Sequence, residues 1–208
     1  MGAFEGGLSF RTYFVEGEPP NDFHEDYLAR IAKNCFVPLH ADGEEERRVG
    51  WVPLQEPLES EFSRGLVFYN QYLVLGYRVD KWSIPAAIFK AHYGRAMRQR
   101  LVGRENVKPS RRERDEVKAE VLGELKRQIL PTMKVVDMVW NMAEHTLRFW
   151  THAGALCEEF SELFEETFSL RLVPDASYTS AMRLGLDEAA LAALLELDPS
   201  RFGDTAVA

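Results

Sequence analysis

The chain has 208 residues, of which 46% are hydrophobic and 28% charged, as expected of a globular protein with one large domain or two small ones. A formal net charge of −8, if it were spread evenly, would argue against a polyanionic partner such as nucleic acid. No apolar run approaches the ~18 residues that cross a bilayer, and the N-terminal residues lack the basic and apolar regions of a secretion signal, so we expect a cytoplasmic protein without membrane contact.

The first part of the chain predicts strands and one helix. Side chains alternate with period two in residues 8–15, which indicates a strand with one buried face. Residues 22–34 have the apolar spacing of a helix, and Asp22 can cap it. A short strand is predicted at residues 49–53. Residues 65–77 are rich in Val, Leu, Tyr and Phe around a central Asn-Gln, which is typical of two strands joined by a tight turn.

Two helices are predicted between Ser83 and Pro131. Ser83 can cap the first helix, whose early proline costs little because a first-turn N–H has no helical partner, and this helix runs to about Leu101. Ser110 and Glu113 have the spacing of a capping box at the start of the second helix. The residues expected to be buried are Ile84, Ile88, Phe89, Met97 and Leu101 in the first helix and Val117, Val121, Leu125 and Ile129 in the second.

The remaining residues predict a hairpin, two helices and a strand. Residues 136–150 contain two alternating segments separated by a polar turn, as in a β-hairpin. Residues 156–168 place their apolar side chains on one helical face and five glutamates elsewhere. A strand follows at residues 170–173, and after it the chain is expected to be loose until an Ala/Leu-rich helix at residues 187–197. The order of elements lacks βαβ regularity.

We therefore predict an α+β fold in which antiparallel strands and hairpins pack with amphipathic helices and a basic helical pair protrudes. Four regions are expected along the chain. They are an N-terminal α+β region (1–80), a basic helical arm (81–131), a hairpin, helix and strand that complete the α+β core (132–180), and a C-terminal helix and tail (181–208).

Charge is distributed very unevenly along the sequence. Between Lys90 and Arg127 twelve basic and six acidic residues give a charge of +6, which leaves −14 for the rest of the chain. Such helices often carry only solvated, mutually paired charges. However, Arg111, Arg112 and Arg114 lie at a helix start, where the macrodipole disfavours cations unless an anion compensates. Phosphate groups would compensate in this way.

No catalytic or metal-binding pattern stands out. The five histidines form no HExxH or paired His/Cys motif, and Cys35 and Cys157 lie in apolar surroundings without ligand spacing. Glu116 and Lys118 match part of a metal-dependent nuclease motif, but the Pro-Asp pair that should precede them, at residues 174–175, follows them. We expect no enzymatic activity, no metal and no cofactor.

Several short motifs follow one another along the chain. In order they are Phe36-Val37-Pro38, Gly50-Trp51-Val52-Pro53, Ile84-Pro85, Pro109-Ser110-Arg111-Arg112-Glu113-Arg114-Asp115-Glu116-Val117-Lys118, Leu130-Pro131, Val136-Asp137 up to Trp140, and Leu172-Val173-Pro174. Their order and spacing, over about residues 4–180, resemble the recombination-associated protein RdgC family. Longer members of that family continue beyond the point at which this sequence ends, so we expect a short variant.

The resemblance implies a non-enzymatic protein that binds double-stranded DNA without sequence preference. Members of the family act in recombination and replication in the bacterial cytoplasm and nucleoid, form ring-shaped homodimers with a basic central hole, and restrain the recombinase RecA. Binding of this kind needs phosphate contacts and no base readout. The candidate DNA-binding residues are Lys90, Arg95, Arg98, Arg100, Arg104, Lys108, Arg111, Arg112, Arg114 and Lys118.

Two alternatives stay open at this point. The basic arm can instead dock an acidic protein partner, for example the glutamate-rich helix at residues 158–166 of another copy. A metal-dependent nuclease is the third class, and it predicts nicking of plasmid DNA in the presence of Mg²⁺ or Mn²⁺.

Overall fold

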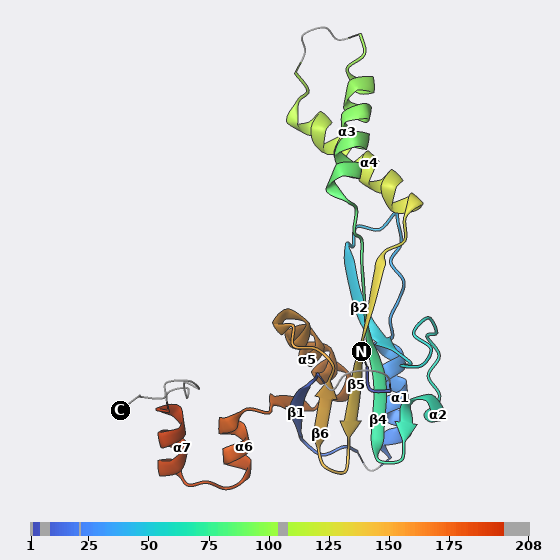
Figure 1. Ribbon diagram of the computed structural model, residues 1–208. Helices are drawn as coiled ribbons and strands as arrows, with labels where there is room; N and C mark the ends of the chain where they lie inside the picture. The colour runs from blue at the N-terminus through green and yellow to red at the C-terminus, as the bar shows by residue number, and fades with distance from the viewer. Residues whose placement is uncertain (1, 5–8, 21, 104–107, 198–208) are drawn as a thin grey trace.

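One antiparallel sheet organises the fold in the computed structural model, which describes residues 2–4, 9–20, 22–103 and 108–197 (Figure 1). Its strands are β1 (Arg11–Glu16), β2 (Arg47–Val52), β3 (Phe68–Tyr69), β4 (Tyr72–Lys81), β5 (Thr132–Asn141), β6 (Thr146–Phe149) and β7 (Arg171–Pro174). The helices are α1 (Phe23–Lys33), α2 (Arg64–Val67), α3 (Ala86–Arg100), α4 (Arg111–Gln128), α5 (Gly154–Phe168), α6 (Ser177–Arg183) and α7 (Glu188–Leu195). None of the helices in these described ranges is long and apolar enough to cross a membrane.

The strands lie in the order β2-β4-β5-β6-β1-β7, and the short β3 pairs with β4. Each of these ladders is antiparallel. The longest ladder joins β4 to β5 and runs from Tyr72 opposite Asn141 to Lys81 opposite Thr132. These antiparallel ladders confirm the predicted α+β class, because a doubly wound fold would require a mostly parallel sheet.

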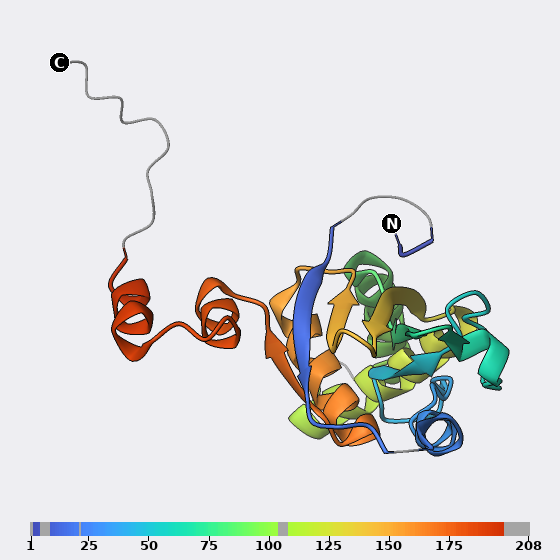
Figure 2. The same cartoon turned by 90° about the horizontal axis from the view of Figure 1, so that it is seen from below.

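The main core lies between one face of the sheet and helices α1 and α5, which pack on that same face (Figure 2). Alternate side chains of each strand point toward these helices, so Leu75 and Tyr77 of β4 and Trp140 of β5 are fully buried. Phe160 of α5 stacks on Phe149 of β6 with ring centroids 3.8 Å apart. The aromatic side chains of this core therefore stabilise the packing of α1 and α5 on the sheet. Because they are buried, they are not available to stack on nucleic-acid bases.

Several local predictions for the N-terminal half need correction. Strand β1 begins at Arg11 and buries Tyr13 and Val15, while the predicted start of this strand at Leu8 lies outside the described residues. Asp22 precedes α1 but its side chain makes no capping hydrogen bond. In the region predicted as two strands, the first half forms the single helical turn α2 before the two-residue β3. The tight turn itself is present, because Asn70 adopts a left-handed φ of 53°.

The C-terminal half matches the predicted hairpin, helix and strand, which are β5–β6, α5 and β7. After β7 the chain forms α6 where a loose segment was expected. That helix is short and fully buries only Ala181, so its sequence carries no apolar stripe from which it could have been recognised. Helices α6 and α7 are joined through Gly185, whose φ is +75°, and they extend away from the sheet (Figures 1 and 2).

Candidate nucleic-acid interface

Residues 82–131 interrupt the β4–β5 hairpin and carry α3 and α4 beyond the end of the sheet (Figure 1). We call these residues the arm. At its base Lys81 lies opposite Thr132, and Thr132 Oγ1 donates a hydrogen bond to Lys81 O at 2.9 Å. The arm is therefore an insertion between two neighbouring, paired strands. Their pairing fixes the point at which the arm leaves the body.

The arm has its own small core, separate from the core of the sheet. Val117, Val121 and Leu125 of α4 are buried, as their four-residue spacing predicts. They pack against a set of half-buried side chains from the other side of the arm, namely Ile84, Phe89, Tyr93, Ala96 and Met97. We call these eight residues the apolar seam. It joins α3 to α4 and leaves their outer faces to charged side chains.

The two helix starts behave differently from one another. Ser110 accepts a hydrogen bond from Glu113 N at 3.2 Å, and Glu113 accepts one from Ser110 N at 2.9 Å, so the predicted capping box is confirmed. The cap expected from Ser83 is wrong, because α3 begins after Pro85 without a side-chain cap. Ile88 was expected to be buried but is 46% exposed, since its position on α3 points away from the seam.

The arm is anchored at its base by a loop of the body. Arg127 Nη2 lies 2.8 Å from Asp42 Oδ1, and Lys126 Nζ lies 3.4 Å from Gly43 O and 5.9 Å from the ring centre of Trp82. These two cations contribute to the charge of +6 in the sequence. In the structure Arg127 and Lys126 contact Asp42 and Gly43 of the body, so they help to hold the arm in place.

Two of the candidate DNA-binding residues are neutralised within the arm. Arg100 lies 3.3 Å from a carboxylate oxygen of Glu116 and 3.6 Å from one of Glu120. Arg112 Nε lies 2.8 Å from Glu116 Oε1. Because each guanidinium already has an anionic partner, these two residues are the weaker candidates for phosphate contact. Arg111 is intermediate, with Asp115 at 4.0 Å and a side chain that is 92% exposed.

The other described candidates are exposed, and none forms an ion pair with a described carboxylate. Within the described ranges no carboxylate lies within ion-pair distance of Lys90, Arg95, Arg98, Lys108, Arg114 or Lys118. Among the residues described, the ion-pair partners of Glu116 and Glu120 are instead Arg100 and Arg112. The last candidate, Arg104, lies outside the described residues.

Helical spacing gathers the unpaired cations on two faces. Lys90 and Arg98 are eight residues apart on α3 and share a face, and Gly94 lies between them. The guanidinium of Arg98 lies over this glycine, with Nη1 3.6 Å from where a Cβ on Gly94 would stand. On α4, Arg114 and Lys118 are four residues apart and also share a face. Each helix thus presents a short row of cations to the solvent.

Two lysines at the base of the arm were missed by the sequence reasoning. Lys81 and Lys134 lie on the strands that enter and leave the arm, and both are exposed. The alternation of β4 and β5 could have placed them on one face of the sheet. The sequence alone did not supply the register of the β4–β5 ladder, which determines that Lys81 and Lys134 are neighbours.

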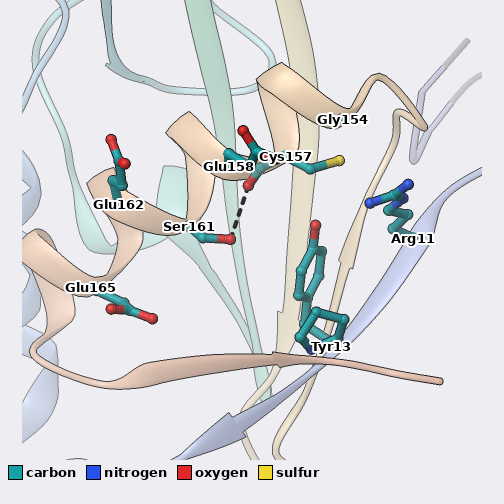
Figure 3. Close-up of a pocket in the computed structure, with 9 residues that line it drawn as sticks. Arg11, Tyr13, Gly154, Cys157, Glu158, Ser161, Glu162 and Glu165 are labelled. Atoms are coloured by element: carbon teal, nitrogen blue, oxygen red, sulfur yellow. Dashed lines mark hydrogen bonds between the residues drawn. The ribbon is translucent and has the colours of Figure 1, made fainter.

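A cleft of about 460 Å³ between β1 and α5 is the second place where polar side chains converge (Figure 3). Burial raises the pKa of the Tyr13 hydroxyl, and the neighbouring Cys157 thiol raises it further. Ser161 Oγ donates to Cys157 O at 2.9 Å, so this hydroxyl is committed to the helix backbone. The lining residues of the cleft include no histidine.

Helix α5 forms the acidic wall of this cleft. Glu158, Glu162 and Glu165 line it from one side of the helix, opposite Arg11 (Figure 3). Across residues 2–4, 9–20, 22–103 and 108–197, no group of three His, Cys, Asp or Glu side chains is placed to hold a metal ion. Glu116 and Asp175, the two acidic residues of the partial nuclease motif, bond to different partners on the arm and beside α6.

No protein-family model matches the chain, and no curated protein matches it.

Proposed function

We propose that this protein binds double-stranded DNA without sequence preference and without catalysis, using the cations of the arm as phosphate contacts. One observation carries the proposal. Six exposed cations of the arm have no carboxylate partner among the described residues, although acidic residues outnumber basic ones in the whole chain. Arg100 and Arg112 of the same arm, by contrast, are paired with carboxylates.

The spacing of the arm cations suits a phosphate backbone. Lys90 and Arg98 are separated by eight helical residues, which is ~12 Å at about 1.5 Å per residue. Duplex DNA carries a negative charge about every 1.7 Å of its axis, so each cation of such a row can meet a phosphate whatever the base sequence. Lysine and arginine on an exposed helix face reach phosphate oxygens without entering a groove, which suits binding without sequence preference.

The resemblance to the RdgC family gives the proposal its cellular setting. We infer a role in recombination and replication at the nucleoid, as a homodimer that restrains RecA by occupying duplex DNA. RecA-promoted strand exchange tests this role directly. The protein should inhibit exchange, and an Arg98→Gln/Arg114→Gln variant should inhibit it less. Equal inhibition by both proteins would show that any effect on RecA does not depend on DNA binding by the arm.

A salt titration tests DNA binding itself. Short fluorescent duplexes of unrelated sequence should bind with similar affinity, and log K should fall linearly with log salt concentration. If each of the six cations meets one phosphate, the slope is about −5, from roughly −0.9 for each contact. No binding at low salt, or binding that does not respond to salt, would refute the proposal.

The acidic side of α5 supports a second candidate function, in which the arm docks another copy of the chain. Glu158, Glu162 and Glu165 line the cleft, and helix α5 contains no lysine or arginine that could pair with them. Sedimentation of nuclease-treated protein separates the two functions. Self-association that is lost in Glu158→Gln/Glu162→Gln protein favours docking, whereas association that requires added duplex favours DNA binding.

A further inference from the structure

The register of the sheet gathers three cations at the foot of the arm. Arg47 of β2 lies directly opposite Lys81 of β4, and Lys134 of β5 lies opposite Val79, one diagonal step from Lys81. Val79 and Val136 are core residues on the helix-covered face, so alternation places Lys81 and Lys134 on this face as well. We call Arg47, Lys81 and Lys134 the basal patch.

Only one carboxylate meets the basal patch within the described ranges. Glu159 of α5 forms an ion pair with Arg47 and also accepts a hydrogen bond from the Tyr77 hydroxyl at 3.4 Å. This network ties the Arg47 guanidinium to Glu159 and Tyr77, next to the core. Both lysines are exposed, and across the described residues neither has an ion-pair partner. The patch thus keeps a surplus of two positive charges.

The opposite face of the same strands shows that this surplus is not a general property of the sheet. There, Arg78 makes two hydrogen bonds to Asp80, at 2.9 and 2.7 Å, and Arg48 pairs with Glu45. Like charges placed directly opposite each other destabilise a sheet, yet Arg47 and Lys81 occupy such positions. Glu159 offsets the charge of Arg47, whereas an anion bound at Lys81 and Lys134 would offset the two charges that are left.

We propose that the basal patch binds backbone phosphates of the same duplex that the arm contacts. The inference rests on the proposed function of the arm. It extends the DNA-binding surface from the helices onto the body, on the face where α5 packs. The patch adjoins the arm because Lys81 is the last residue of β4 and the arm begins at the next residue. The glutamates of α5 limit the surface on the other side, since they repel phosphate.

The inference is tested by charge variants of the full chain, with a short fluorescent duplex as the probe. Lys81→Gln/Lys134→Gln should lower the magnitude of the slope of log K against log salt by roughly 2 and weaken binding at ~0.1 M salt by at least about tenfold. Glu159→Gln should act in the opposite direction, because it frees Arg47 for phosphate, and should raise the magnitude of the slope by up to about 1. Lys33→Gln/Arg64→Gln removes two exposed charges elsewhere on the body and is the matched control.

The outcomes separate this inference from the proposed function. If Arg98→Gln/Arg114→Gln weakens binding while Lys81→Gln/Lys134→Gln behaves like the control, the basal patch is not a contact and the arm still is. If Glu159→Gln also leaves binding unchanged, no role in DNA binding is left for Arg47. A parent chain that fails to bind duplex at low salt overturns both proposals. Thermal melting of each variant checks that these surface changes leave the fold intact.

Discussion

Truncation of Leu125 tests the structural independence of the arm. This side chain is 3% exposed and belongs to the apolar seam, which has no member in the main core. A buried Leu→Ala change costs about 2–5 kcal/mol. At about 1.4 kcal/mol for each tenfold change, Leu125→Ala should raise the local opening constant of the arm at least roughly thirtyfold. The body should keep its stability, because β4 and β5 pair without the seam.

Hydrogen exchange of backbone amides measures this effect segment by segment. Amides of α3 and α4 should exchange much faster in Leu125→Ala protein, while those of β4 and β5 keep their protection. Leu122→Ala is the matched control, since Leu122 lies on the same helix, is only half-buried and does not belong to the seam. Equal loss of protection in the arm and in the sheet would refute the idea that the arm folds around its own core.

Three further changes probe other parts of the fold. Ser110→Ala should cost about 1 kcal/mol by removing the cap of α4, visible as faster exchange in its first turn, and unchanged exchange would count against the cap. Thr167→Val should cost about 1–3 kcal/mol in urea unfolding, because the indole N–H of the buried Trp51 now donates to Thr167 Oγ1 at 2.8 Å; a change within error would argue against that bond. Burial raises the pKa of Asp137, so its carboxyl favours folding at low pH and loses this contribution as pH rises through its raised pKa. Asp137→Asn should therefore increase stability at neutral pH and flatten the decline above pH ~4, and an unchanged pH profile of urea midpoints would contradict this.

Local signals in the sequence predicted local structure well. The Ser110–Glu113 spacing predicted the capping box, and the four-residue spacing of Val117, Val121 and Leu125 predicted the buried stripe of α4. Both depend on side chains three or four residues from the next one, where geometry is fixed by the helix itself. The alternation of β5 likewise identified its buried face.

Contacts between distant residues could not be predicted in this way. Nothing in the sequence assigns Glu116 to Arg100, which lies on the other helix of the arm, or Asp42 to Arg127, 85 residues away. A prediction from composition therefore cannot tell which basic residues of the arm are free to contact phosphate. The structure distinguishes cations that are used within the fold from cations that are exposed and unpaired, such as Arg98, and only the latter are strong candidates for phosphate contact.

The central claim is that the unpaired cations of the arm meet duplex phosphates. The most direct measurement compares the salt dependence of duplex binding in the parent chain, in Arg98→Gln/Arg114→Gln, and in the body control Arg64→Gln/Arg171→Gln, which carries the same change in net charge. The arm variant should lose roughly 2 from the magnitude of the slope, equally for unrelated sequences, while the control keeps the parent slope. Equal slopes in the parent and the arm variant, or equal losses in the arm variant and the control, would contradict the claim.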